Sequence, residues 1–214
     1  MIKQIITASA LALTVAFTGS AIAGSHGGKL AVGITPSMQK YSGNVTIQRN
    51  QDQNNVVNPA FAKTSRKCPP FCIQPMNLAP GVATIGEVEV IEYIKKMEEG
   101  ANVLVVDSRT PDWVGRGTIP GAKNLPWTKL NPAKGADPIS ISEIMIGEFG
   151  AKEVEGLWDF SSAKTLVMFC NGMWCGQSPN NIKNLLKFGY PADKIKWYRG
   201  GMQDWEILGL STQK

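Results

Sequence analysis

Apolar and polar positions alternate along residues 83–214 in a way that predicts strands and helices in turn. Thr165–Phe169 is a short apolar run with the length and residue types of a buried strand. Residues 103–106 are apolar throughout, as in a central strand covered on both faces, and they predict a second strand over 102–107. Further short strands are expected at 83–85, 123–125 and 194–198.

Apolar residues three or four positions apart predict two longer helices between these strands. In residues 87–99 the apolar face is formed by Val88, Ile91, Ile94 and Met97. In residues 178–188 it is formed by Ile182, Leu185, Leu186 and Phe188. Ser178 and Pro179 suit the N-cap and the first turn of this second helix. Shorter helices are expected at 112–115, 142–149 and 202–208. The alternation predicts an α/β domain whose central parallel sheet has helices on both faces.

The first 23 residues have the pattern of a secretory signal peptide. Lys3 is followed by an apolar run over 5–17, and Ala21-Ile22-Ala23 is a small-x-small cleavage site. The alternative is a retained membrane anchor, but the run is short for a span. We therefore expect a periplasmic or secreted protein, cut after Ala23, with no membrane span after signal cleavage.

Residues 24–82 form an extended N-terminal arm, and residues 83–214 form the α/β domain. The arm is rich in Gly, Ser, Asn and Gln, with one candidate strand over 44–49. The chain's net charge of +5 comes from the residues before Cys68, which include seven basic residues and one acid, since the rest of the chain carries 15 basic and 16 acidic residues. The arm has no dense Lys/Arg cluster, so nucleic acid is not an expected partner. Such an arm lies across the domain or becomes ordered with a periplasmic protein partner.

The four cysteines fall in two close pairs, Cys68/Cys72 and Cys170/Cys175. In an oxidising compartment they can form disulfides. Cys68 and Cys72 enclose two prolines, and a structural disulfide is favoured over a redox pair because thioredoxin-type pairs enclose two residues rather than three. The spacings fit neither a zinc ribbon nor a common iron–sulfur motif, so no metal or cofactor is expected. The only histidine, His26, lies in the arm, which excludes a Cys–His protease.

Cys170 stands where the apolar run Thr165–Phe169 stops, before a loop that leads into a helix. Ligands collect at the carboxyl ends of strands in parallel sheets. Backbone N–H groups and the helix dipole at this position would lower the pKa of the thiol and hold an oxyanion or a persulfide. The alternative is an ordinary buried core cysteine.

From about residue 83 to 212 the chain resembles the rhodanese family. Five pieces appear in the family's order: Val-Asp107-Ser-Arg109, Gly117-Thr-Ile-Pro-Gly-Ala122, the strand before Cys170, a helix ending in Phe-Gly-Tyr190, and Tyr198-Arg-Gly-Gly-Met-x-x-Trp205. The arm has no counterpart in a minimal domain of this family. The resemblance implies the rhodanese-like α/β fold.

It also implies a sulfurtransferase in which Cys170 takes sulfur from thiosulfate, polysulfide or a protein persulfide. The persulfide would then pass its sulfur to a thiol or another thiophilic acceptor. The substrate-binding loop would be Asn171, Gly172, Met173, Trp174, Cys175, Gly176, Gln177 and Ser178. Asp107 and Arg109 match positions that organise the strand end rather than react.

Three departures from the family pattern keep other functions open. Ser178 lies two positions further from Cys170 than usual, as in related phosphatases with longer loops, but those need an arginine in the loop and this loop has none. The missing positive charge also weakens thiosulfate as the donor relative to polysulfide or a protein persulfide.

Cys175 could resolve a Cys170 persulfide into a disulfide, which would make the protein a thiol–disulfide or persulfide exchanger. Alternatively Cys175 is an inert thiol beside Trp174 or part of a fixed disulfide. The remaining alternative is a non-catalytic rhodanese binding module.

Overall fold

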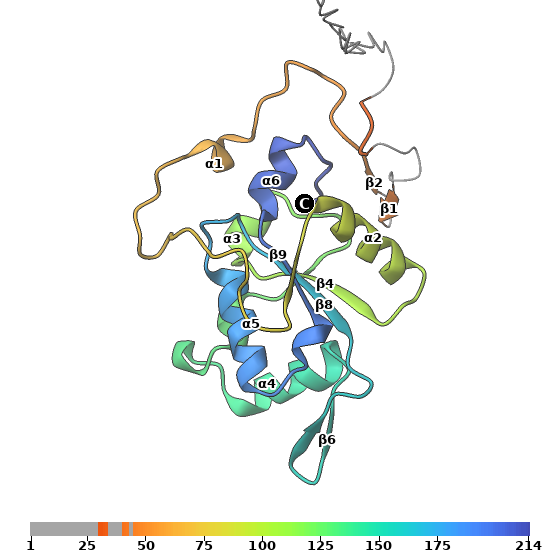
Figure 1. Cartoon of the computed structure of the whole chain (residues 1–214), viewed down its shortest axis with the longest axis vertical. Coiled ribbons are helices and arrows are strands. Elements are labelled where there is room, and N and C mark those ends of the chain that lie inside the picture. The colour runs from red at the N-terminus through yellow and green to blue at the C-terminus, as the bar shows by residue number, and fades with distance from the viewer. Residues whose placement is uncertain (1–29, 34–39, 43–44) are drawn as a thin grey trace, which may run out of the picture.

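The computed structural model describes residues 30–33, 40–42 and 45–214 (Figure 1). The expected signal peptide, its cleavage site after Ala23, and His26 lie outside the described residues. Among the described helices, none combines the length and the apolar character that a membrane span requires.

A five-stranded parallel sheet forms the centre of the domain, in the order β3-β9-β8-β4-β5. Its strands are β3 (Ala83–Ile85), β4 (Val103–Asp107), β5 (Lys123–Asn124), β8 (Thr165–Phe169) and β9 (Ile195–Tyr198). The register pairs Asp107 with Phe169 and Phe169 with Tyr198. Three neighbouring strands therefore end in one row, and the chain leaves the sheet there at Cys170.

Helices cover both faces of the sheet, which confirms the α/β fold expected from the sequence (Figure 1). The helices of the domain are α2 (Glu87–Glu98), α3 (Pro111–Val114), α4 (Pro138–Glu143), α5 (Gln177–Lys187) and α6 (Gly201–Ile207), with a π-helix η4 (Ile144–Glu148) and 3₁₀ turns η2 (Trp127–Leu130), η3 (Pro132–Lys134) and η5 (Ala192–Lys194).

Alternate residues of β8 point into two separate cores. Leu166 and Met168 pack with apolar side chains of α4, η4 and α5 on one face. Val167 and Phe169 pack with those of α2 and α6 on the other. This two-sided burial explains why β8 is apolar from Leu166 to Phe169, as its sequence predicted.

Two helix predictions need correction. Val88 is exposed, and the buried residues of α2 are Val90, Ile91 and Ile94. The predicted face with Val88 and the observed face with Val90 both fit a helical period. Only the packing of the helix against the sheet determines which face is buried. The helix expected at 142–149 begins earlier, at Pro138, because the Asp137 side chain accepts a hydrogen bond from the Ser140 N–H at 3.0 Å and caps it.

A hairpin of β6 (Lys152–Val154) and β7 (Leu157–Asp159), absent from the sequence prediction, projects from the domain (Figure 1). Its two-residue turn has Glu155 at φ 53° and Gly156 at φ 79°. Positive φ at both central residues is the geometry that fits the twist of paired strands. The Glu155-Gly156 pair was the local signal for this turn.

The described part of the arm packs on the domain and contributes to its core. Strands β1 (Lys40–Ser42) and β2 (Val45–Ile47) pair antiparallel beside α2, and α1 (Pro59–Ala62) lies beside α6 (Figure 1). Ile47 and Phe61 are fully buried in the core that contains α2 and α6.

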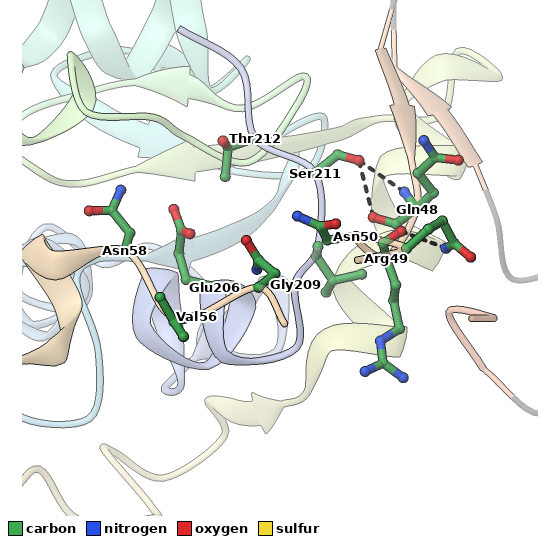
Figure 2. A pocket seen from close by; sticks show the side chains of 12 residues that line it. Gln48, Arg49, Asn50, Val56, Asn58, Glu206, Gly209, Ser211 and Thr212 are labelled. Carbon is green, nitrogen blue, oxygen red and sulfur yellow. Dashed lines mark hydrogen bonds between the residues drawn. The ribbon is translucent and has the colours of Figure 1, made fainter. Parts of the chain in front are cut away.

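The arm and the C-terminal segment also enclose a polar pocket (Figure 2). The Ser211 hydroxyl bonds to the backbone of Gln48 there, with both contacts at 3.1 Å. The cavity has a volume of about 510 Å³, and none of its lining residues belongs to the Cys170 loop.

Candidate active site at Cys170

Cys170 directly follows β8, and the residue is 2 % exposed. The loop after it is fixed by the start of α6. The backbone N–H of Met202 donates to the Cys170 carbonyl, and that of Gln203 donates to the Asn171 carbonyl, both at 2.9 Å. Gly201 permits this close approach, since it has φ 58° and a Cβ there would overlap the Cys170 carbonyl oxygen.

The Ser178 hydroxyl donates a hydrogen bond to the Cys170 Sγ at 3.1 Å. The indole Nε1–H of Trp197 donates to the Ser178 Oγ at 3.2 Å, so the serine oxygen is occupied as an acceptor and its proton is directed at the sulfur. The expectation that Ser178 is the N-cap of the following helix is therefore wrong. Helix α5 begins at Gln177, Gly176 is its N-cap, and Ser178 lies within its first turn.

Hydrogen bonds make Cys170 the more acidic thiol of the site. Burial opposes its ionisation, but hydrogen bonds from the Cys175 thiol, the Ser178 hydroxyl and the backbone N–H groups of Ser178 and Gly172 lower the pKa of Cys170 to about 7. A substantial fraction is therefore thiolate at neutral pH, and thiolate is the nucleophilic form.

Cys175 has the opposite character. Both Cys170 and Cys175 are free and buried. Burial, the hydrogen bond to Cys170 and the negative charge of the Cys170 thiolate raise the pKa of Cys175 well above its ordinary value. The pair thus consists of one thiolate and one protonated thiol that donates to it. A nucleophile and a nearby second thiol can carry out either persulfide formation or disulfide exchange.

Asp107 and Arg109 form a fully buried ion pair at the end of β4, with Nη2 and Oδ2 2.6 Å apart. The Arg109 Nη2 also donates to the Gly117 carbonyl at 2.7 Å, and the Thr118 hydroxyl donates to Asp107 Oδ2 at 2.6 Å. Arg109 Nη1 reaches the Asn171 Oδ1 at 3.5 Å. The pair thereby connects the end of β4 to the loop, and its charges are satisfied without any ligand.

A cavity of about 380 Å³ lies beside the loop. It is lined by Pro70, Phe71, Trp113, Trp127, Asn171, Cys175, Gly176, Gln177 and Asn180. Cys170 is not among these residues, so Cys175 and its neighbours are what a molecule in the cavity meets first. The aromatic walls suit an apolar or weakly hydrated guest.

Residues 66–74 of the arm, here called the strap, lie against this loop. The backbone N–H of Gln74 donates to the Met173 carbonyl at 2.8 Å, and both Nε and Nη2 of Arg199 donate to the Gln74 carbonyl. The Phe71 ring meets the Trp174 ring edge-on, with centroids 5.1 Å apart. The strap therefore covers the loop that the sequence predicted as the substrate site.

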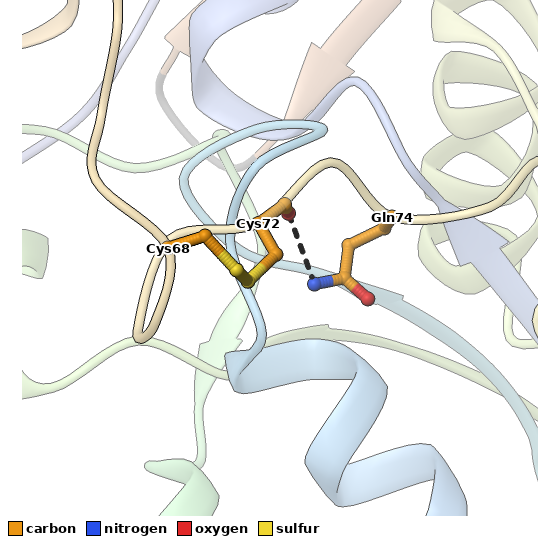
Figure 3. The surroundings of a disulfide bond; sticks show 3 residues. All are labelled: Cys68, Cys72 and Gln74. Carbon is orange, nitrogen blue, oxygen red and sulfur yellow. Dashed lines mark hydrogen bonds between the residues drawn. A yellow bond between two sulfur atoms is a disulfide. The ribbon is translucent and has the colours of Figure 1, made fainter.

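Cys68 and Cys72 are joined in a disulfide that closes a turn of the strap, with Cα atoms 4.7 Å apart (Figure 3). The sequence left a structural disulfide and a redox pair as the two interpretations of Cys68 and Cys72, and in the structure the two cysteines are bonded. The Gln74 side chain folds back to donate to the Cys72 carbonyl at 3.2 Å. The disulfide thus stiffens the strap next to Phe71.

The structure gathers the residues that the sequence singled out. Cys170, the loop from Asn171 to Ser178, Asp107 and Arg109 share one end of the sheet, and Cys68/Cys72 reach the loop through Phe71. Sequence reasoning missed Trp197, Gln203 and Arg66. Alternation along β9 was a usable signal for Trp197. No local pattern indicated that Arg66 would meet the loop, because that contact depends on how the arm folds over the domain.

Replacing Ser178 with alanine should raise the pKa of Cys170 by about one unit, which corresponds to about 1.4 kcal/mol. With a pKa of about 7, about nine tenths of Cys170 is thiolate at pH 8 and about a tenth at pH 6. The variant loses the hydroxyl donor to the sulfur, so its titration midpoint moves up. Thiolate absorbance against pH, with a Cys170→Ser sample subtracted, measures the shift.

Ser140→Ala is the matched control, because it removes a serine hydroxyl bonded to Asp137 on the remote helix α4. An unchanged midpoint in Ser178→Ala would show that this hydroxyl does not stabilise the thiolate.

The match to one family model agrees with this architecture. The model of the family described as Rhodanese-like domain matches residues 90–208. None of the curated proteins compared matches the sequence. A Rhodopseudomonas palustris protein described as a possible tyrosine phosphatase is 18 % identical, with 62 % of this chain and 85 % of that chain covered and a TM-score of 0.40. An uncharacterised Saccharomyces cerevisiae protein is 25 % identical, with 58 % and 90 % covered and a TM-score of 0.40. A human single-domain sulfurtransferase is 21 % identical, with 58 % and 95 % covered and a TM-score of 0.35.

Proposed function

Because this chain belongs to the rhodanese-like family, we propose that it is a sulfurtransferase that carries sulfane sulfur as a persulfide on Cys170. The observation that carries the proposal is the environment of this thiol. It ends the central strand, its pKa is lowered to about 7, and a hydroxyl and two backbone N–H groups point at its sulfur. These donors would also stabilise the negative charge of a persulfide.

The first step needs only the thiolate. Cys170 Sγ attacks the outer sulfur of thiosulfate, the bond between the two thiosulfate sulfurs breaks, and sulfite leaves with the electron pair. The product is a Cys170 persulfide anion, so charge and atoms balance. In the second step a thiolate acceptor attacks the outer persulfide sulfur, takes it as its own persulfide, and regenerates the Cys170 thiolate.

Peptide mapping of the protein before and after exposure to thiosulfate or a polysulfide tests this proposal. The protein is first treated with mild reductant, so that Cys170 is free. We expect the peptide that contains Cys170 to gain one sulfur atom, which a later thiol acceptor removes. If the reduced protein takes up no sulfur from either donor, the enzyme proposal fails and a non-catalytic binding module takes its place.

A second candidate function is persulfide or disulfide exchange by Cys170 and Cys175 together. The observation in its favour is that Cys175 bonds to Cys170 and also lines the cavity. The Cys175 sulfur would attack Cys170 Sγ, pass its proton to the outer sulfur, which leaves as hydrosulfide, and form a Cys170–Cys175 disulfide. Two thiols are oxidised and one sulfane sulfur is reduced, so an external dithiol must restore the pair. Release of hydrosulfide without an added acceptor distinguishes this exchange from simple sulfur transfer.

We also propose that the mature protein works outside the cytoplasm. The support is the leader-like N-terminus together with the Cys68–Cys72 disulfide, which persists best in an oxidising compartment. Mass measurement of the mature chain from the exported fraction tests this, with cleavage expected after Ala23.

A further inference from the structure

The Cys68–Cys72 disulfide closes a ring around the two strap residues that line the cavity beside the loop (Figure 3). These residues are Pro70 and Phe71, and they stand between the two cysteines in the sequence. Closing so short a ring removes most of the conformations that the segment would otherwise adopt. The disulfide therefore fixes one wall of the cavity.

The same wall covers the thiol pair. Phe71 packs against the cluster that contains Cys170, Trp174 and Cys175, and both cysteines are only 2 % exposed. A molecule that reacts with Cys170 has to reach its sulfur, so part of this cover must move. The strap contributes no strand to the central sheet, so it can move without disturbing the strand that carries Cys170.

The two ends of the strap are held very differently. At Gln74 the backbone N–H donates to the Met173 carbonyl, and Arg199 donates to the Gln74 carbonyl from Nε at 3.1 Å and from Nη2 at 2.8 Å. These bonds do not involve the disulfide. The other end is Arg66, whose guanidinium carbon lies 3.7 Å from the centroid of the Trp174 ring. Gln74 is therefore the fixed end about which the rest of the strap can turn.

The contacts of Arg66 do not hold its end of the strap firmly. Among the described residues its enclosed Nε has no hydrogen-bond partner, and its Nη2 has a long contact of 3.5 Å to the Ala60 carbonyl. Burial lowers the pKa of the guanidinium, so covering this charge costs free energy. Opening the strap would return these N–H groups to water. The closed position therefore depends on the disulfide, which excludes most open conformations.

The disulfide itself can be reached from solvent. Cys68 is exposed and Cys72 is half-buried, and the next residue, Ile73, is 83 % exposed. A dithiol can reduce the bond in two steps. One of its thiolates attacks Cys68 Sγ and Cys72 leaves as a thiolate. Its second thiolate then attacks the reductant's own sulfur in the mixed disulfide and releases Cys68. The dithiol is oxidised to a disulfide, and its two protons pass to the strap cysteines.

We propose that Cys68–Cys72 is a redox-controlled site, and that its reduction by a dithiol opens the strap and gives reactants access to Cys170. In the bonded form Phe71 stays on the thiol cluster and the site is closed. In the reduced form the segment from Arg66 to Phe71 turns away about Gln74. The inference goes beyond the proposed sulfur transfer, because it concerns access to this thiol whatever reaction follows.

Alkylation of Cys170 by iodoacetamide at pH 8 measures access without any sulfur transfer. The protein is the chain from residue 24 onward with Cys175→Ser, so that Cys170 has no neighbouring thiol, and a peptide map verifies the strap disulfide. Reduction with dithiothreitol, which is then removed without oxygen, should raise the alkylation rate at least about tenfold, the order of the loop-closure effect of a short disulfide ring. Adding Cys68→Ser and Cys72→Ser should give the same faster rate without reductant.

Two further variants make the result independent of how the cysteine variants fold. Phe71→Ala keeps the disulfide and removes the cover, so its Cys170 should react fast even when the strap is bonded. Ile73→Ala is the matched control, since this side chain of the strap points to solvent, and it should react as slowly as the parent. The titration midpoint of Cys170 should be equal in all forms, because its hydrogen-bond donors lie outside the strap. Equal alkylation rates of the bonded and reduced forms would overturn the proposal, as would a fast reaction of Phe71→Ala alone.

Sulfur uptake from a neutral dialkyl trisulfide separates this inference from the proposed function. The reduced strap should speed loading of Cys170 by the same factor as alkylation. If the reduced form is alkylated faster but neither form takes up sulfur, the proposed function fails and control by the strap stands. If both forms take up sulfur and are alkylated at equal rates, the proposed function stands and control by the strap fails.

Discussion

Replacing Cys170 with serine is expected to abolish sulfur uptake from every donor, because a serine hydroxyl is not ionised near neutral pH and cannot form a persulfide. The neighbouring thiol of the site, Cys175, is not activated in the same way. Cys175 lies next to Cys170, but its pKa is raised well above its ordinary value, so it stays protonated where Cys170 is thiolate. The measurement is the mass of the protein and of its peptides after exposure to thiosulfate or a trisulfide.

Cys175→Ser is the matched control, since it removes the neighbouring buried thiol and keeps a hydroxyl donor in its place. It should still load one sulfur atom on Cys170. If Cys175 only supports the thiolate, the variant transfers sulfur to an added thiol with a modestly raised pKa of Cys170. If Cys175 resolves the persulfide, the variant instead accumulates the persulfide and releases no hydrosulfide. Uptake by Cys170→Ser on the Cys175 peptide would reverse the assigned roles.

The sequence predicted the parts of this protein that depend on local patterns. Short apolar runs located the two central strands, and the strand Thr165–Phe169 is found with the predicted limits. The position of Cys170 follows from that strand, since a residue after a parallel strand lies at the edge where the loops gather. Asp107 falls at the same edge for the same reason, through its pairing with Phe169.

What the sequence could not predict depends on contacts between distant segments. Ser178 has the residue type of an N-cap, and only the path of the loop turns its hydroxyl toward Cys170. The sequence of the loop contains no lysine or arginine. In the folded chain Arg66 of the strap lies against the loop, because its guanidinium packs on the Trp174 ring. Such contacts have no period and no short motif, so they become visible only when the chain is folded.

Replacing Asp107 with asparagine should destabilise the fold by about 3–5 kcal/mol, because it leaves the guanidinium of Arg109 buried without its counter-charge. Both side chains are fully buried, and the carboxylate accepts three side-chain bonds from Arg109 and Thr118 at its Oδ2. The asparagine keeps the shape of the side chain but removes the negative charge. Urea denaturation measures the loss as a lower midpoint, and urea is preferred over guanidinium chloride because it does not screen charges.

Two further variants determine whether the loss comes from the buried charge. Glu99→Gln removes a carboxylate from the exposed pair with Lys95, whose atoms are 3.8 Å apart, and should cost less than about 1 kcal/mol. The double variant Asp107→Leu/Arg109→Met removes both charges, and it should be more stable than the sum of the two single losses predicts. A small cost for Asp107→Asn, or strict additivity in the double variant, would mean that the pair contributes little to the end of β4. In that case the path of the loop at Asn171 would depend on its bonds to α6 alone.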